Sequence, residues 1–484
     1  MKKYIFSIMA AAVVLVSCDR QDSLLETEPQ GNVSSTQIED LLKEFPEKAV
    51  TVLGGAEAGN NNYLVQFNTN DRGAHDDFGY MSIRTGLDHM TNDLVMTNSH
   101  WFNSYYQYVA RNVDNSRNEM VWRFNYKVVY NMNEVLKQIP GEQAVPAAKY
   151  IKGRALAMRA MAYMDLIRTY AVGDLGIPYY SEGDREISVQ SRVPTTEVWT
   201  NILTDLEESY QLLEGYARPS KESVDQSVVA GFLARAYMET KNYTKAASYA
   251  NRARQSYPLM SEAQLKDGFQ FISNPEWMWG SDINSSTTTL YASFFSHMSN
   301  INDGYAGLLG IYRAIDARLY DAIPATDIRK DWFLGAAATV DGYKLPKYAN
   351  VKFYDDTFFE GDYLYMRAAE FYIIEAEALA RSGNETQARA VLDLLVKTRD
   401  SAFSASNYSG AALLQEIRKQ RKIELWGEGG EWWEMKRFNE SLVRVYPGSN
   451  HANFGKFDIP AGDPKFHFAI PQKELNANPN VSNP

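Results

Sequence analysis

The chain has 484 residues, which is enough for about two to four ordinary domains or for one large domain. Its net charge of −11 and its pI near 5.3 argue against binding to nucleic acid, because that recognition begins with a basic surface. Aromatic residues make up 13% of the chain, and 31 of them are tyrosines, a residue that suits surfaces that stack on a ligand.

The N-terminus carries the pattern of a lipoprotein signal peptide. Two lysines precede an apolar run over residues 5–16, which is too short to span a bilayer because a spanning helix needs about 20 residues. The run ends in Leu-Val-Ser-Cys, which looks like a bacterial lipoprotein box. We therefore expect residues 1–17 to be removed and Cys18, the single cysteine, to carry acyl chains that anchor the protein without spanning the membrane. With that thiol consumed, neither disulfides nor thiol catalysis remain.

A polar tether over residues 18–36 is predicted to precede one folded domain over residues 37–484. We expect a first helix near residues 37–45. Residues 54–80 are rich in Gly, Asn and Asp and show no sustained period, so the sequence predicts an ordered loop there.

The middle of the chain is predicted to be a helical core, formed by about residues 118–257 and 362–440. Apolar residues recur three and four positions apart over 118–139, 148–170 and 194–213, which predicts three helices. The return to helix is expected at Leu364. A further helical stretch is expected over residues 413–438, with the glycine-rich residues 427–430 between amphipathic helices. Residues 258–361 lose the helical period, so we expect short strands and long loops there. An insertion of this length in a helical repeat is usually where function resides.

Two helical hairpins in the core share one pattern of small residues. Ala234, Ala236, Asn242 and Ala246 recur in the same spacing as Ala376, Ala378, Asn384 and Ala388. Alanine at these places lets two helix backbones approach closely, and the polar break at the asparagine starts a second helix. The pattern indicates a mainly α fold with a tetratricopeptide-like core, although any alanine-rich helical hairpin would share part of it.

The sequence offers little that indicates catalysis. It contains no metalloprotease, lipase or P-loop motif, and its six histidines are scattered, so we expect no cofactor and no metal site, and leave calcium binding open. Carboxylates in two groups are the remaining enzymatic candidates, and a glycosidase would need two of them opposed in space. The groups are Asp71, Asp76 and Asp77, and Glu424, Glu428, Glu431 and Glu434. Because basic residues surround the second group, ion pairing is its default role.

Residues 417–438, IRKQRKIELWGEGGEWWEMKRF, resemble the signature of the SusD/RagB family of Bacteroidetes lipoproteins. The end of the chain, FAIPQKELNANPNVSNP, is similar to the closing segment of that family, and residues 366–400 are similar to its R-x-A-E-x-Y block. The tandem Trp432-Trp433 departs from the pattern, as does Asp19 directly after the lipobox.

The resemblance implies a lipid-anchored binding protein on the outer-membrane surface, not an enzyme. Such a protein captures an oligosaccharide, or in some relatives a peptide, and delivers it to a SusC-type TonB-dependent transporter. A lipoprotein glycosidase and a helical-repeat adaptor that contacts only proteins remain as alternatives.

Ligand contacts are predicted in two stretches outside the helical periods. Sugar sites pair aromatic rings with amide, carboxylate or guanidinium groups, and residues 98–106 and 284–305 offer that mixture, together with Asp71 and Arg72. We expect Trp101 to be the main platform, although it could equally fill space beneath the loops. The expected helpers are Tyr105, Tyr291, Phe295 and His297.

Overall fold

A computed structural model describes residues 35–139, 145–184 and 189–484. Cys18, the predicted signal peptide and most of the predicted tether lie outside these residues. In the ranges that are described, no helix is both long enough and apolar enough to cross a membrane. Buried apolar residues from Leu42 near the first helix to Val481 near the end of the chain belong to one contiguous hydrophobic core.

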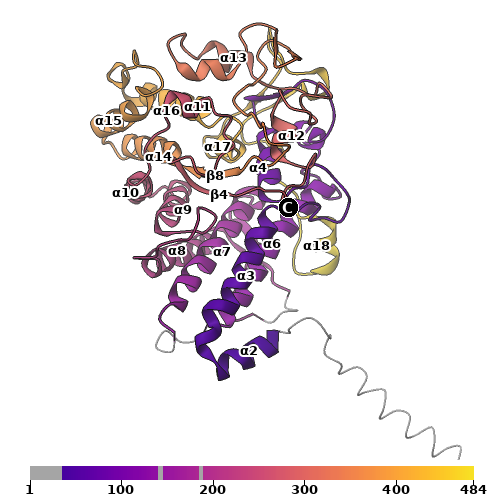
Figure 1. Ribbon diagram of the computed structural model, residues 1–484, viewed down its shortest axis with the longest axis vertical. Coiled ribbons are helices and arrows are strands. Elements are labelled where there is room, and N and C mark those ends of the chain that lie inside the picture. The colour runs from indigo at the N-terminus through magenta and orange to yellow at the C-terminus, as the bar shows by residue number, and fades with distance from the viewer. Residues whose placement is uncertain (1–34, 140–144, 185–188) are drawn as a thin grey trace, which may run out of the picture.

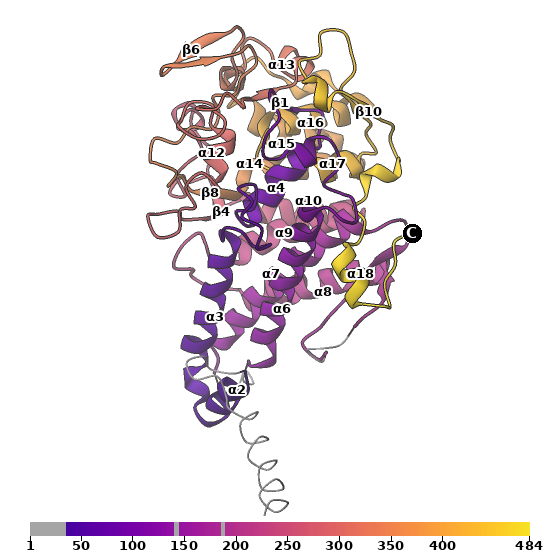
Figure 2. The ribbon, with the colours of Figure 1, turned by 90° about the vertical axis from the view of Figure 1, so that its right-hand side faces the viewer.

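Antiparallel helices pack one on the next to form the helical core, so the predicted mainly α fold is confirmed (Figures 1 and 2). From α6 to α15, each core helix contacts the core helix that follows it in the chain, and α16 packs on α14. These helices are α6 Ser116–Lys137, α7 Ala148–Tyr170, α8 Thr195–Leu212, α9 Gln226–Glu239, α10 Tyr243–Arg254, α14 Ala368–Arg381, α15 Glu385–Val396 and α16 Gly410–Glu424.

The two predicted hairpins are α9 with α10 and α14 with α15. Ala236 and Ala378 are fully buried, as are the other alanines of both patterns, and α10 packs between α9 and α14. The side chain of Asn242 accepts the backbone N–H of Lys245 at 3.2 Å, which caps the start of α10. The polar break between the two helices of the first hairpin is therefore a helix cap.

The prediction of a loop over residues 54–80 was wrong for its first part, because α3 spans Ala49–Leu64. This helix packs against α6 and α7 and buries Leu53, Asn60 and Leu64. Each glycine in a helix costs about 1 kcal/mol relative to alanine, so the glycines and asparagines of this segment gave no local signal for a helix. Burial of the leucines against two neighbouring helices decides the conformation.

The helical stretch predicted over residues 413–438 consists of two helices with the glycines between them, as expected. The chain breaks between α16 and α17 Glu431–Arg437, and Gly427, Gly429 and Gly430 have φ angles of 74°, 88° and 97°. A Cβ atom on Gly429 would lie 2.5 Å from Cβ of Arg84, so glycine is required both for the backbone angle and for the close approach.

The remaining elements are short, and most of them lie at the end of the molecule away from α2 and α3 (Figure 2). The strand pairs are antiparallel: β1 Leu94–Met96 with β5 Arg313–Ile315, β2 Leu175–Pro178 with β3 Arg192–Pro194, β4 Trp277–Ser281 with β8 Tyr363–Arg367, β6 Ala338–Val340 with β7 Tyr343–Leu345, and β9 Leu442–Val443 with β10 Asp458–Ile459. The remaining α-helices are α2 Ser35–Glu44, α4 Tyr80–Asp88, α5 Asn103–Tyr106, α11 Glu262–Leu265, α12 Phe294–Met298, α13 Ala317–Asp321 and α18 Gln472–Ala477. The 3-10 helices are η1 Pro46–Lys48, η2 Ile328–Trp332, η3 Ala405–Asn407, η4 Asn453–Gly455 and η5 Pro464–Phe466. Leu364, expected to begin a helix, lies instead in β8, because it pairs with Gly280 of β4.

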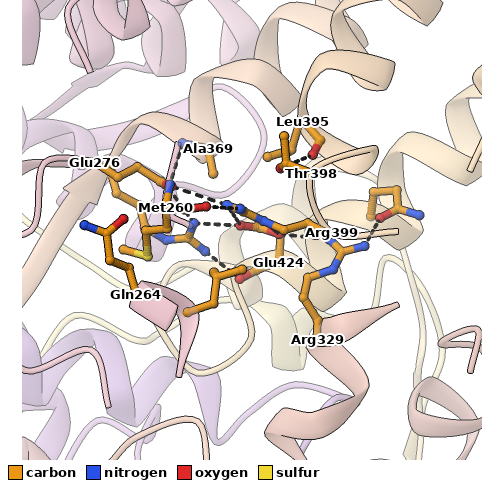
Figure 3. Close-up of polar contacts among 12 residues, drawn as sticks. Met260, Gln264, Glu276, Arg329, Ala369, Leu395, Thr398, Arg399 and Glu424 are labelled. Atoms are coloured by element: carbon orange, nitrogen blue, oxygen red, sulfur yellow. Dashed lines mark hydrogen bonds and ion pairs between the residues drawn. The ribbon is translucent and has the colours of Figure 1, made fainter. Parts of the chain in front are cut away.

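A buried ion-pair network joins the inserted region to the helical core. Glu424 accepts hydrogen bonds from Arg329 at 2.9 Å, from Arg367 at 2.7 Å and from Arg399 at 3.1 Å (Figure 3). Glu276, the residue before β4, accepts from the same Arg367 at 2.7 Å and from Arg399 at 3.3 Å. All five side chains are at most 1% exposed.

The other late glutamates are also paired, as predicted. Glu428 accepts from Arg367 at 2.7 Å and from Lys352 at 2.5 Å. Glu431 pairs with Arg418, and Glu434 pairs with Arg437. Within residues 417–438, Glu424 and Glu428 therefore join the helical core to the inserted region, through Arg329 and Lys352.

Candidate functional site

Aromatic rings from four loops form a connected surface that we call the aromatic array. It consists of His75, His100, Trp101, Tyr291 and Tyr305. The rings of His75 and Trp101 stack with centroids 5.6 Å apart and planes at 12°. The ring of Tyr305 lies 5.0 Å from that of His100 and 6.2 Å from that of Tyr291. Tyr291 is 42% exposed and His100 is exposed, whereas the other three rings are partly buried.

Hydrogen bonds join the loops that carry the array. The Tyr305 hydroxyl and Nδ1 of His75 are 2.8 Å apart, so the two loops share a hydrogen bond. Nε2 of His297 donates to the backbone carbonyl of His75 at 2.8 Å, and the ring of His297 stacks on Tyr305 at 5.0 Å. Burial, and then the nearby Arg313, lower the pKa of His297 well below its usual value, so this support is a neutral imidazole near pH 7.

Side chains beneath the array hold Trp101 in place. The Arg117 guanidinium lies 5.8 Å from the centre of the indole ring and forms two hydrogen bonds with buried Asp76, at 2.6 and 2.9 Å. Asp76 also accepts the backbone N–H of Phe102 at 3.3 Å. The indole N–H is buried and has no hydrogen-bond partner in the described part of the chain. Trp101 therefore partly fills space beneath the loops, which was the alternative that the sequence left open.

Tyr105, Phe295 and His297, predicted as ligand contacts, are fully buried. The ring of Tyr105 fits against Gly86, where a Cβ atom would lie only 2.6 Å from it, and the ring of Phe295 fits equally closely against Gly361. A ligand on the surface cannot contact side chains in these positions. They support the array from below, because α5 and α12 turn them toward the core.

Asp71 and Arg72, also predicted as ligand contacts, lie at the edge of the same loop as His75. Both are exposed, and each pairs with α6: Asp71 with Arg123 at 3.0 Å and Arg72 with Glu119 at 3.3 Å. These pairs fasten the loop to the first turns of α6.

The sequence did not single out four residues that the structure brings into or beside the array. His75 and His100 looked scattered, and Tyr305 was only the end of a predicted stretch. Phe67 extends the apolar surface, since its ring contacts His75 at 5.6 Å. A signal for His100 and Tyr305 was present in the clustering of aromatic residues within the two stretches. The hydrogen bond between Tyr305 and His75 joins residues 230 positions apart, so the sequence did not show it.

The carboxylates near the array form hydrogen bonds within the protein. Asp77 accepts from the Thr69 hydroxyl at 2.8 Å and from the backbone N–H of Asn70 at 2.9 Å, and burial raises its pKa. Within the described residues, no group of three or more His, Cys, Asp or Glu side chains could hold a metal ion. What the surface presents is a row of rings edged by imidazole, phenol and guanidinium groups, which suits stacking on a flat apolar face that carries hydrogen-bonding groups at its rim.

Comparison with known proteins identifies relatives along most of the chain. Residues 50–238 match a SusD-like family described as "Starch-binding associating with outer membrane", and residues 335–484 match the SusD family. The SusD-like protein P38 of Formosa agariphila is 21% identical over 400 residues, which are 69% of this chain and 75% of that protein.

Solved structures share the fold. A SusD-like carbohydrate binding protein from Bacteroides vulgatus is 27% identical and superposes with a TM-score of 0.78 over 89% of this chain and 97% of its own. A SusD superfamily protein from Bacteroides thetaiotaomicron is 20% identical, with a TM-score of 0.74 over 89% of this chain and 99% of its own.

Proposed function

Because this chain belongs to the SusD/RagB family, we propose that it is a non-catalytic binding protein and that its aromatic array is the surface that captures an oligosaccharide. The family assignment rests on the two family matches, which together cover more than half of the chain. The observation that carries the proposal is the array itself, in which Tyr291, Tyr305 and Trp101 form one row of rings bordered by His75 and His100.

The chemistry of the array matches that of a sugar. A pyranose presents a flat face of C–H groups ringed by hydroxyls, so it is recognised by an aromatic ring together with polar groups at the ring edges. Among Trp101, Tyr291 and Tyr305, the ring of Tyr291 is the most exposed, at 42%. Trp101, which lies against Arg117 and His75, offers less free area. We therefore place the main stacking contact on Tyr291 and Tyr305, with Trp101 beside them.

The partner and the location in this proposal come from the family. The protein is an outer-membrane surface lipoprotein that is anchored through Cys18 and delivers its ligand to a SusC-type TonB-dependent transporter. Co-purification of such a transporter with the tagged full-length protein from the outer membrane tests the partnership. Recovery of the protein alone under the same mild detergent would contradict it.

The binding proposal is tested by calorimetry with Tyr291→Ala. Covering about 50 Å² of apolar ring at about 25 cal/mol per Å² is worth roughly 1.2 kcal/mol, so the variant should bind the best hexasaccharide nearly tenfold more weakly. The panel consists of malto-, cello-, xylo- and mannohexaose together with a set of hexapeptides. Phe45→Ala is the matched control, because Phe45 is 41% exposed and follows α2 at the opposite end of the molecule.

The possible results separate the alternatives. Unchanged affinity in Tyr291→Ala would remove the array from the site. Binding of hexapeptides and of no hexasaccharide would identify a peptide-binding member of the family. Turnover of a bound hexasaccharide by the purified protein would favour a glycosidase.

A further inference from the structure

A second aromatic cavity lies beside α6, away from the aromatic array. It has a volume of about 570 Å³, which is within the range of small-molecule sites. Its walls are α6, the residues Tyr180, Ser181 and Asp184 after β2, and the C-terminal segment with α18, which lies alongside α6 in both views of the ribbon (Figures 1 and 2). Four rings line it: Trp122, Tyr126, Tyr130 and Tyr180.

The inner walls of this cavity are fixed by hydrogen bonds. Tyr126 donates its hydroxyl proton to the carbonyl of Pro178 at 2.7 Å, and the indole N–H of Trp122 donates to Glu474 at 3.3 Å. The rings of Trp122 and Tyr126 are 4.7 Å apart, and that of Tyr180 lies 5.9 Å from Tyr126. The polar ends of these side chains therefore bind the neighbouring segments and hold the rings in place.

The rim of the cavity is charged but balanced. Four cationic and four anionic side chains line it: Arg123, Lys127, Lys137 and Lys473, and Glu119, Glu134, Asp184 and Glu474. A rim of this kind offers hydrogen bonds without favouring a strongly charged ligand. At the open end, the Lys127 ammonium lies 4.5 Å from the centre of the Tyr130 ring, which is 38% exposed. Rings with hydrogen-bonding groups beside them are the same combination that the aromatic array presents.

The loop that carries His75 connects the two surfaces. Its Asp71 and Arg72 pair with Arg123 and Glu119, and both of these α6 residues line the cavity. Arg117, in the first turn of the same helix, contacts Trp101 of the array. At 1.5 Å per residue, the helix from Arg117 to Tyr130 is about 20 Å long. A ligand that crossed the Asp71–Arg72 edge could therefore follow α6 from one set of rings to the other.

We propose that this cavity is a second subsite for neutral carbohydrate, which binds the far end of the same oligosaccharide that the array holds. This inference rests on the proposed function, since it assigns a further part of that ligand to a further part of the surface. The cavity then adds affinity only for oligosaccharides long enough to span about 20 Å along α6. The cavity therefore makes the protein selective for the length of the oligosaccharide.

The test compares Tyr130→Ala, Tyr291→Ala and Leu394→Ala with the wild type by calorimetry. Leu394 is 56% exposed on α15, which is remote from α6, and serves as the surface control. The probes are maltose, cellobiose, xylobiose and mannobiose together with the four corresponding hexasaccharides. For the hexasaccharide that the wild type binds best, Tyr130→Ala should lose nearly tenfold in affinity, whereas affinity for the matching disaccharide should not change. Tyr291→Ala should weaken both, and Leu394→Ala neither.

The outcomes distinguish this inference from the proposed function. Wild-type affinity of Tyr130→Ala for the hexasaccharide would overturn the second subsite and leave the array in place. Weakening by Tyr130→Ala of the disaccharide and the hexasaccharide alike would also overturn it, because the cavity would then be a site of its own. If Tyr130→Ala lowered the affinity for carbohydrate and Tyr291→Ala had no effect, the binding site would be the cavity and not the array. If no saccharide of either length bound the wild type, both proposals would fail.

Discussion

Replacing Glu424 by Gln tests whether the buried ion-pair network holds the inserted region against the helical core. The network is balanced, because four cations face four carboxylates. They are Arg329, Lys352, Arg367 and Arg399, and Glu276, Asp327, Glu424 and Glu428. The substitution keeps the volume of the side chain and removes one negative charge. It therefore leaves a net positive charge among groups that water does not reach.

The expected loss is large. Breaking a buried pair by removing one partner typically costs about 3–5 kcal/mol. Glu424 contacts three arginines, Arg329, Arg367 and Arg399, and it is itself fully buried, so we expect a loss of stability within that range. By contrast, Glu385→Gln should cost less than about 0.5 kcal/mol, because Glu385 pairs with Arg389 at the surface.

The effect should also depend on pH. Burial alone would raise the pKa of Glu424, but Arg399, Arg367 and Arg329 lower it well below its usual value. A carboxyl with a depressed folded-state pKa stabilises the fold above its unfolded-state pKa, near 4.3, and that contribution is lost as the pH falls toward the folded-state value. The difference between wild type and Glu424→Gln should therefore be greatest near neutral pH and shrink below about pH 4.

Equilibrium urea unfolding followed by tryptophan fluorescence measures the difference directly. Glu385→Gln is the matched control, since it makes the same chemical change in a partly exposed pair. If Glu424→Gln unfolded at the same urea concentration as this control at pH 7, the network would not hold the fold together, and the reasoning from buried charge would be refuted.

Two further predictions concern the hairpins and the anchor. Leucine at Ala236 or at Ala378 should overpack a fully buried helix contact and cost about 1–3 kcal/mol, and an unchanged melting midpoint in both variants would contradict that packing. Metabolic labelling with a palmitate analogue should mark the wild type and spare Cys18→Ala, and equal labelling of the two would place the anchor elsewhere.

Helices with regular spacing could be predicted from the sequence. The segment over 148–170 was predicted with the bounds that α7 has, because its alanines, methionines and leucines recur three and four positions apart. The paired alanines of the two hairpins likewise indicated close helix contacts. These features depend on residues a few positions apart, so they can be read from one stretch at a time.

Other local structure is decided by contacts that the sequence does not show. Residues 54–64 are helical because Leu53 and Leu64 are buried against α6 and α7. The glycines at 427–430 indicated the break after α16, but not the contact of Gly429 with Arg84, which is more than 300 positions away in the chain. At residues 54–64, the tertiary neighbours outweigh the local pattern.

The candidate site, too, could be predicted from the sequence only in part. The sequence identified the stretches that carry Trp101 and Tyr291, because aromatic and polar residues gather there outside any helical period. It could not tell that Tyr105 and Phe295 are buried while Tyr291 is exposed, because five or fewer residues of α5 or α12 carry no clear period. The hydrogen bond between His75 and Tyr305 joins residues 230 positions apart, and the bond between Trp122 and Glu474 joins residues 352 positions apart. Such contacts form only when the folded core brings distant segments together, so only the tertiary structure could place the rings of the array and of the cavity.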